Sequence, residues 1–264
     1  MLALITNDDG IQSPGISVLA EVARRVFDRV VVVAPRGQQS AVSHAITINK
    51  MFRVFPDGQD RYALEATPAD CVFYAVRQIL DQKPDYVLSG VNLGPNLGFD
   101  TLYSGTVAGA REGLMHGIRS ISFSLAANRP VPFDQAAPVI EQVLRNAGRF
   151  DWDPDVMLNV NIPSREMFSD PKGFRACSLG TRVFDNKTAQ FTDPMGNTHG
   201  WIGGREFALK GDDDSDCVWL KKGYVTITPL TWNLCSKGMK AAVRLAGDLG
   251  TEGALDTAQQ GRSR

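Results

Sequence analysis

Hydrophobic positions fall into two kinds of block along the first part of the chain. Short unbroken apolar runs predict strands that are buried on both faces. Longer stretches in which apolar residues recur every three or four positions predict helices. The runs occupy residues 1–5, 30–34, 86–89, 120–125 and 157–162, and the periodic stretches occupy 14–27, 68–80, 107–115 and 136–144. The alternation of the two predicts an α/β fold built from βαβ units, with a mostly parallel sheet and helices on both faces.

The pattern changes beyond about residue 164. Gly, Pro, Asp and Asn become more frequent, and short candidate strands at 174–178, 181–184, 201–202 and 224–227 replace the alternation. An irregular hairpin is also predicted at 51–62. We therefore expect an α/β catalytic core at 1–164 and a β-rich region at 165–249. Residues 250–264 contain few large apolar side chains and are predicted to be a disordered tail.

The side chains of the β-rich region support two smaller expectations. Trp201, Trp219 and Trp232 lie in a loop-rich segment that could not bury them all, so they are expected to pack against the core or against a partner chain. The acidic run at 212–216 lacks the glycine and the terminal glutamate of a calcium-binding loop, so we interpret it as a solvated loop.

Composition excludes several classes of protein. The net charge is −1 and the pI is about 6.3, which leaves no electrostatic footprint for nucleic-acid polymers or anionic membranes. No apolar run approaches the ~20 residues of a membrane span, and the first strand lacks the basic segment of a signal peptide. The cytoplasm is the expected compartment.

Cysteine and histidine spacing argues against a zinc site. The four cysteines are widely separated, with no C-x-x-C pair, and are predicted to be free thiols in packed positions. The three histidines, His44, His116 and His199, show no close ligand spacing either.

The first candidate site follows the first strand, where the chain reads Asn7-Asp8-Asp9-Gly10. Carboxylates at the carboxyl end of a buried parallel strand lie where open α/β sheets bind ligands. Adjacent aspartates repel each other, and a bound cation relieves that repulsion. The alternative is a simple turn, because Asp and Gly are common turn residues.

Three further stretches are predicted to lie at the same edge of the sheet. The polar loop 36–43 follows the second strand, and the Gly- and Asn-rich loop 90–100 follows the third. The latter matches neither the dinucleotide fingerprint nor the P-loop, but its glycines let backbone N–H groups approach a ligand. Ser104-Gly105-Thr106 then opens a helix, where an anion site and a simple helix cap are the two interpretations. The neighbouring loop favours the anion site.

Together these stretches predict a metal beside a phosphate. Asp8, Asp9, Ser40 and Asn92 all offer oxygen ligands, which suit one Mg²⁺ or Mn²⁺ ion per subunit. Ser104 to Thr106 would hold the phosphate. A divalent metal beside a phosphate indicates hydrolysis of a phosphoester.

The same motifs resemble those of the stationary-phase survival protein SurE family of nucleotidases. The similar segments are T-N-D-D-G-I-x-S-P-G-I, V-V-A-P, A-T-P-A-D-C-V, S-G-V-N-L-G-P-N-L-G and Y-S-G-T-V-A-G-A-R-E-G, followed by Gly180-Thr-Arg182, Asp193-Pro-x-Gly-Asn197 and G-Y-V-T-I-T-P-L at 223–230. The match runs in order from residue 1 to about residue 230. The combination of motifs is specific.

The resemblance implies a Rossmann-like core and a metal-dependent phosphatase acting on nucleoside 5′- and 3′-monophosphates. It implies homodimers or homotetramers that exchange carboxyl-terminal segments. Carried over by position, it implies Asp8, Asp9, Ser40 and Asn92 as metal ligands. It also implies Asn96, Ser104, Gly105 and Thr106 as phosphate neighbours.

The expected catalytic residues are Asp8 and Asp9, with Asp8 also steering the attacking water. A metal-bound water is the expected nucleophile, because a covalent aspartyl-phosphate of the haloacid-dehalogenase kind would need Asp-x-Asp where this chain has Asp-Asp-Gly. Two alternatives remain: a nucleotide-binding regulator without turnover, and an assembly module.

One segment departs from the family pattern. The loop reads A-P-R-G-Q-Q-S-A at 34–41, where many members have A-P-D-R-x-x-S-G, which puts loop geometry and base selectivity in doubt. His44, close to this loop, is interpreted either as a substrate contact or as a structural residue.

Overall fold

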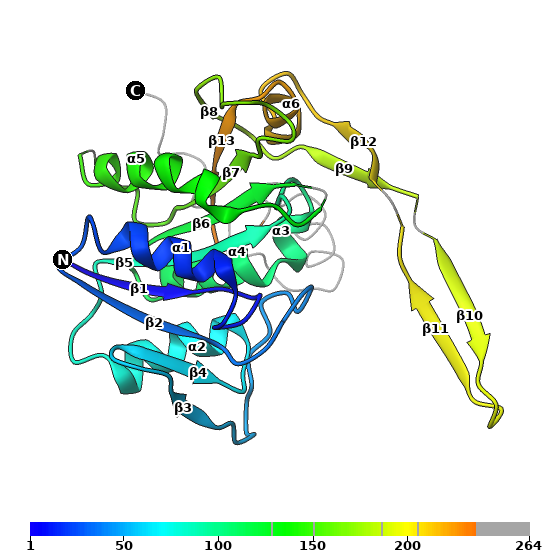
Figure 1. The fold of residues 1–264 in the computed structure, drawn as a ribbon, viewed down its shortest axis with the longest axis horizontal. Coiled ribbons are helices and arrows are strands. Elements are labelled where there is room, and N and C mark those ends of the chain that lie inside the picture. Colours follow the sequence, from blue (N-terminus) through cyan, green and yellow to red (C-terminus); the bar gives the residue numbers. More distant parts are fainter. Residues whose placement is uncertain (128, 150, 186, 205, 236–264) are drawn as a thin grey trace, which may run out of the picture. The chain divides into compact units, whose positions relative to one another are not determined.

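The computed structural model describes residues 1–235 except 128, 150, 186 and 205 (Figure 1). The chain divides into two compact units, Met1–Trp232 and Asn233–Arg264. The predicted tail at 250–264 lies outside the described residues. None of the described helices has the length and apolar character needed to cross a membrane.

A nine-stranded sheet forms the centre of the first unit, in the order β3-β4-β2-β1-β5-β6-β7-β13-β8. From β4 to β7 every neighbouring pair is parallel, while β3 and β13 run antiparallel to their inner neighbours β4 and β7. The strands are β1 (Leu2–Thr6), β2 (Arg29–Pro35), β3 (Val54–Pro56), β4 (Arg61–Leu64), β5 (Tyr86–Leu93), β6 (Arg119–Ala126), β7 (Met157–Pro163), β8 (Phe174–Ala176) and β13 (Val225–Leu230). The mostly parallel sheet and the hairpin β3–β4 are as predicted.

Helices cover both faces of this sheet, because the side chains of a strand alternate between faces. In β1, Ala3 and Ile5 belong to the apolar cluster that contains the helix residues Ile16 and Ile140, whereas Leu2 and Leu4 pack in the cluster that contains Val72. The helices are α1 (Pro14–Ala23), α2 (Pro68–Tyr74) with the π-helical turn η1 (Ala75–Ile79), α3 (Asp100–Tyr103), α4 (Gly105–Met115), η2 (Phe133–Ala136) and α5 (Ala137–Ala147). The Rossmann-like α/β class is therefore confirmed.

Two helices begin at the predicted positions, residues 14 and 68. Ser13 caps α1, with Pro14 in the first turn. Thr67 and Asp70 form a reciprocal capping box at the start of α2, which gives the free N–H groups of the first turn their hydrogen-bond partners.

The third predicted strand is longer than expected. Instead of ending at Ser89 in a loop, β5 continues to Leu93 with a shift of register between Ser89 and Asn92. Gly90 makes this possible, because a Cβ there would stand 2.4 Å from the carbonyl oxygen of Phe123 on β6. The strand thus carries Asn92 to the rim of the sheet.

Among its described residues, the β-rich region contains two antiparallel strand pairs and one helix. β9 (Thr181–Phe184) pairs with β12 (Glu206–Lys210), and β10 (Thr188–Thr192) pairs with β11 (Thr198–Ile202). After α6 (Asp216–Lys221) the chain returns to the central sheet as β13. This region therefore supplies β8 and β13 to the same sheet as the core.

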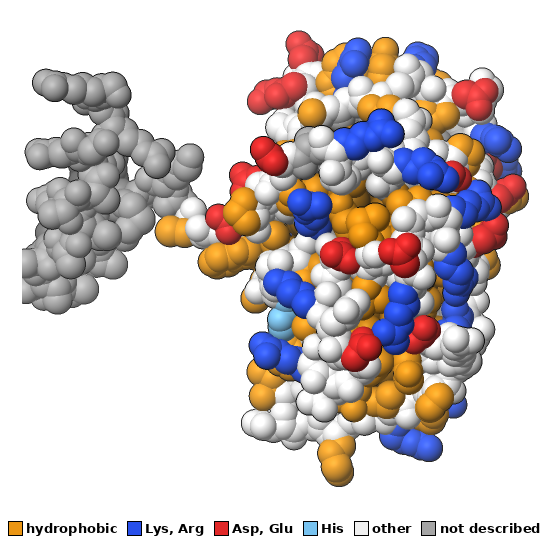
Figure 2. All heavy atoms as spheres, turned by 90° about the vertical axis from the view of Figure 1, so that its left-hand side faces the viewer, with side chains coloured by type: hydrophobic (Ala, Val, Ile, Leu, Met, Phe, Trp, Pro, Cys, Tyr) orange, Lys and Arg blue, Asp and Glu red, His pale blue; other side chains and the backbone are white. Residues whose placement is uncertain are grey.

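Other expectations for this region are met only in part. Trp219 packs edge-on against Tyr224 with 5.1 Å between ring centroids, but Trp201 and Trp232 are about half exposed. Three cysteines are buried thiols as predicted, whereas Cys235 is exposed. On the face in Figure 2, acidic and basic side chains are interspersed.

The interpretation of residues 212–216 as a solvated loop is wrong at its last two residues, Ser215 and Asp216, which are both buried. Asp216 is fully buried, and its carboxylate accepts hydrogen bonds from the backbone N–H groups of Gly98, Gly180 and Cys217 at 3.1, 2.7 and 2.7 Å. Three donors compensate the buried charge. The sequence pattern could not reveal this, because the partners are distant in the chain.

Candidate active site

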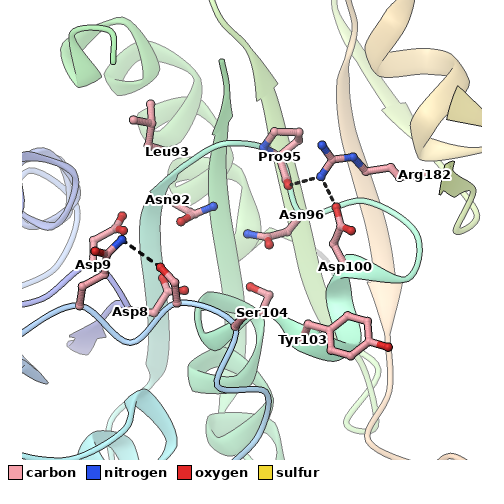
Figure 3. Close-up of a pocket in the computed structure, with 13 residues that line it drawn as sticks. Asp8, Asp9, Asn92, Leu93, Pro95, Asn96, Asp100, Tyr103, Ser104 and Arg182 are labelled. Carbon is pink, nitrogen blue, oxygen red and sulfur yellow. Dashed lines mark hydrogen bonds and ion pairs between the residues drawn. The ribbon is translucent and has the colours of Figure 1, made fainter. Parts of the chain in front are cut away.

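A polar pocket of about 370 Å³ opens at the carboxyl edge of the parallel strands (Figure 3). It lies beside the ends of β1 and β5, the loop after β2 and the start of α4. Its lining comprises Asp8, Asp9, Gln38, Ser40, Ala41, Asn92, Leu93, Pro95, Asn96, Asp100, Tyr103, Ser104 and Arg182. The pocket thus brings together six of the eight predicted site residues, and Gly105 and Thr106 lie directly behind it.

Asp8 is the most buried carboxylate of the pocket, with 6% of its surface exposed. The hydroxyl of Thr106 donates to its Oδ1, and the backbone N–H of Thr106 also hydrogen-bonds to it. Burial nevertheless raises the pKa of Asp8 to about 6, and the charge of Asp9 adds to that rise. The amino-terminal end of α4 therefore faces a carboxylate whose negative charge is only partly compensated.

Asp9 and Asn92 flank Asp8 on the sheet side. Burial raises the pKa of Asp9, while the backbone N–H of Leu93 opposes the shift by donating to its carboxylate. The Asn92 amide nitrogen donates to the carbonyl of Gly94 at 2.8 Å, which directs its Oδ1 toward the aspartates (Figure 3). The three oxygen-bearing groups thus face the same side of the pocket.

Ser40 reaches the pocket from the loop after β2. Gln38 donates to the Ser40 hydroxyl at 3.0 Å, and the backbone N–H of Gln39 donates to the carbonyl of Asp8 at 2.7 Å. Farther along this loop, His44 Nε2 lies 2.7 Å from Oε2 of the buried Glu112 on α4. This contact fits the structural interpretation of His44, and the substrate interpretation stays a prediction.

Asn96 lines the pocket on the side of Asp100 (Figure 3) and is held by side chains of neighbouring strands. Its backbone N–H donates to Asn161 Oδ1 at 2.8 Å, and its carbonyl accepts from Asn159 and Asn161 at 2.8 and 3.1 Å. Its side-chain amide donates to the Ser124 hydroxyl at 2.8 Å. These hydrogen bonds fix Asn96 between Asn92 and Asp100 (Figure 3).

Ser104 caps the amino-terminal end of α4. The Ser104 hydroxyl accepts from the N–H of Val107 at 3.1 Å, so the capping interpretation of this residue is confirmed. Thr106 is fully buried and directs its hydroxyl to Asp8 rather than into the pocket. Ser104 itself lines the pocket, so a role beside a phosphate stays a prediction.

Several functional candidates were missed from the sequence. Asn159 and Asn161 alternate with apolar residues in β7, and such buried asparagines in an inner strand are a usable signal. Asp100 and Arg182 also line the pocket, but only the fold brings β9 to this edge.

The residues of the pocket fit a divalent cation. Two carboxylates, an amide oxygen and a hydroxyl are hard oxygen ligands, and in the described part of the chain neither Asp8 nor Asp9 has an ion-pair partner. Among the described residues, no group of three or more His, Cys, Asp and Glu side chains is arranged to hold a metal ion. The predicted ligand set is not of this kind, because it combines two carboxylates with a serine hydroxyl and an asparagine amide.

Fold and pocket define a Rossmann-like α/β protein whose polar site lies at the carboxyl edge of a parallel sheet. Residues 3–186 match the family described as Survival protein SurE. A 5′-nucleotidase SurE from Alkaliphilus metalliredigens is 39% identical over 240 residues, covering 89% of this chain and 94% of that protein. A protein of the same name from Aquifex aeolicus is 38% identical over 247 residues, covering 93% and 98%.

The structural comparison agrees. The crystal structure of the SurE protein from Aquifex aeolicus matches with a TM-score of 0.82 at 37% identity, covering 94% of this chain and 100% of the solved chain. The chain belongs to the survival protein SurE family.

Proposed function

We propose that this protein is a phosphoric monoester hydrolase, a divalent-metal-dependent nucleotidase that converts nucleoside 5′- and 3′-monophosphates to nucleoside and phosphate. The names of its relatives support the 5′-nucleotidase activity. The observation that carries the proposal is the buried Asp8 carboxylate at the start of α4, beside a second carboxylate and two neutral oxygen ligands. Such a set suits Mg²⁺ or Mn²⁺.

The ligands of the cation would be Asp8, Asp9, Ser40 and Asn92. When bound, a divalent cation polarises a phosphoryl oxygen and lowers the pKa of water, which is the chemistry that phosphoester hydrolysis needs. The protein residues supply orientation. Thr106 fixes one oxygen of Asp8, and the hydrogen bond from Gln39 holds the Ser40 loop against the end of β1.

On the other side of the pocket, Asn96 and Ser104 would hold the phosphate, with Gly105 and Thr106 behind them. The strand asparagines that fix Asn96 support this role, because a preorganised amide loses little freedom when a ligand arrives. Asp8 would orient the attacking water. The Asp-Asp-Gly sequence lacks the spacing of an aspartyl-phosphate motif, which supports water as the nucleophile.

The test is phosphate release from a panel of nucleoside 5′- and 3′-monophosphates. Metal-stripped protein should be inactive, and Mg²⁺ or Mn²⁺ should restore turnover in the wild type but not in Asp8→Asn. Asp28→Asn is a matched control, because Asp28 is an exposed aspartate that pairs with the amino terminus. Folded, metal-loaded wild type that released no phosphate would contradict the proposal.

The state of assembly is a second part of the proposal. We propose a homodimer or homotetramer formed by exchange of carboxyl-terminal segments. The half-exposed side chains of Trp201 and Trp232 support this, because a partner chain could cover them. Light scattering of the full chain and of a chain ending at residue 232 measures the masses, and an unchanged oligomer after truncation would contradict segment exchange.

A further inference from the structure

The wall of the pocket opposite the aspartates carries Arg182, which comes from β9 of the β-rich region (Figure 3). Within the described residues it is the one basic side chain among those lining this pocket. Its side chain is 14% exposed. A guanidinium that is already largely removed from water binds an anion more strongly than an exposed one does.

The guanidinium is held by groups next to the proposed phosphate site. Nη1 of Arg182 pairs with the carboxylate of Asp100 and donates to the carbonyl of Pro95 at 3.3 Å. Pro95 immediately precedes Asn96, so the cation lies next to the residue proposed to hold the phosphate. Figure 3 shows the Arg182 side chain extending toward this loop.

The backbone that carries Arg182 is fixed by Asp216. Its buried carboxylate accepts from the N–H of Gly180 and from the N–H of Gly98, which joins the β9 turn to the loop that contains Asn96. The two backbones also meet closely, since a Cβ on Gly98 would stand 2.4 Å from the carbonyl oxygen of Gly180. Arg182 therefore has a fixed position relative to Asn96.

The charges of the pocket lining indicate what the Arg182 guanidinium could bind. Among the described residues, the lining has three carboxylates, Asp8, Asp9 and Asp100, and one guanidinium. A phosphate monoester dianion would be repelled by these groups, and a divalent cation at Asp8 and Asp9 offsets only that side. The opposite side needs its own positive group, and guanidinium matches phosphate oxygens in a bidentate fork.

We infer that Arg182 is a substrate-binding residue whose guanidinium contacts the phosphate group of the nucleotide. Asp100 is its resting partner, and Asp216 is the positioning residue that holds the β9 turn. This inference rests on the proposed function for the identity of the substrate. It adds a cationic contact from the β-rich region to a site otherwise built by the core.

The test compares Arg182→Gln, Arg182→Lys and Asp100→Asn in Mg²⁺-loaded protein. Arg182→Gln should raise the KM for a nucleoside monophosphate about 10- to 100-fold, the usual effect of losing a charged hydrogen bond. It should weaken competitive inhibition by inorganic phosphate by a similar factor. Inhibition by the nucleoside product should stay within about twofold. Arg182→Lys should recover part of the loss.

Arg61→Gln is the matched control. Like Arg182, Arg61 pairs with a carboxylate, that of Asp57, and donates to a backbone carbonyl, that of Ile11, but it lies on β4 and does not line this pocket. It should leave both KM and phosphate inhibition unchanged. Metal affinity should be unchanged in all these variants.

Asp100→Asn separates binding from a structural ion pair. If Arg182 contacts phosphate, this variant keeps the cation and should bind inorganic phosphate as well as or better than the wild type. Loss of affinity in Asp100→Asn equal to that in Arg182→Gln would overturn the inference, as would unchanged phosphate inhibition in Arg182→Gln. If the wild type hydrolyses no nucleotide, the proposed function fails, and calorimetric binding of inorganic phosphate still tests Arg182.

Discussion

Gly105 lies directly against Asp8. A Cβ at position 105 would stand 2.7 Å from the Cβ of Asp8 and 3.1 Å from its Oδ2, and 3.1 Å from the carbonyl oxygen of Gln39. The nearest of these atoms, the Cβ of Asp8, is fixed by the backbone, and the Gln39 oxygen belongs to the backbone itself. Only a glycine therefore lets the first turn of α4 approach the buried carboxylate.

Gly105→Ala should reduce turnover at least about 100-fold while the protein stays folded, because a shift of the carboxylate by a fraction of an ångström misplaces the proposed ligands. Steady-state kinetics and circular dichroism measure the two effects. Gly148→Ala is the control, since the nearest atom to its added Cβ is 3.9 Å away. Full activity in Gly105→Ala would show that the approach of α4 to Asp8 does not matter.

Asp8→Asn should stabilise the metal-free protein at pH 7 although it abolishes activity. Burial raises the pKa of Asp8 from 3.8 to about 6, so its stabilising contribution is complete below pH 3.8 and is lost as the pH rises through about 6. That difference corresponds to about 3 kcal/mol, taken as an order of magnitude. Urea unfolding of metal-free wild type and variant at pH 7 and pH 4 measures it. A gain at pH 7 that shrinks at pH 4 is expected, and equal stability at both would contradict the role of Asp8.

Metal affinity should fall as the pH drops below about 6, by up to tenfold for each pH unit. A proton on Asp8 competes with the cation for the same oxygens, because ligands must be deprotonated to bind. Titration calorimetry with Mn²⁺ between pH 5 and pH 8 gives the affinities. In Asp8→Asn the residual affinity should lose most of this pH dependence. A wild-type affinity that is flat across the range would count against Asp8 as a ligand.

Asn161→Ala should raise the KM for nucleotide about tenfold without changing metal affinity. Removal of the side chain leaves the buried N–H of Asn96 without its acceptor, at a cost of about 1–3 kcal/mol. The melting temperature should fall as well. Asn146→Ala, the same change on the exposed surface of α5, should alter neither quantity. An unchanged KM in Asn161→Ala would mean that Asn96 does not hold substrate.

His44→Ala should weaken metal binding about tenfold. The 2.7 Å contact with Glu112 ties the loop that carries Ser40 to α4, and the loop is also held where Ser43 donates to the carbonyl of Leu102 at 2.6 Å. Calorimetry with Mg²⁺ measures the change. His199→Ala is the control, because His199 bonds only within the β10–β11 hairpin in the described structure. Unaltered metal affinity in His44→Ala would show that the contact between His44 and Glu112 does not position Ser40.

The core of the fold could be predicted because its signals are local. The five inner strands, β2, β1, β5, β6 and β7, were visible as apolar runs, and the caps of α1 and α2 follow from Ser13, Thr67 and the prolines that succeed them. The clustering of Asp8, Asn92 and Ser40 followed from one rule, that parallel strands end at the same edge. The pocket of the structure brings these residues together as that rule requires.

What could not be predicted depends on contacts between distant segments. The extension of β5 past Ser89 depends on how close Gly90 comes to Phe123 on β6. The burial of Asp216 depends on Gly98 and Gly180 arriving beside it, and an acidic run gives no sign of that. Arg182 reaches the pocket because the same hydrogen bonds, from Gly98 and Gly180 to Asp216, hold the start of β9 beside the loop that contains Asn96. Periodicity and motif spacing contain no information about contacts between segments that are far apart in the chain.

The return of β13 to the central sheet has a consequence for biosynthesis. β13 pairs with β7, yet residues 164–224 separate the two strands in the chain. A ribosome therefore completes every residue proposed to bind metal before the strand that covers the edge of β7 exists. Until then that edge exposes unpaired N–H and C=O groups, which invite pairing with other chains. Once Val225–Leu230 has been synthesised, it can pair with β7 and cover the edge that would otherwise pair with other chains.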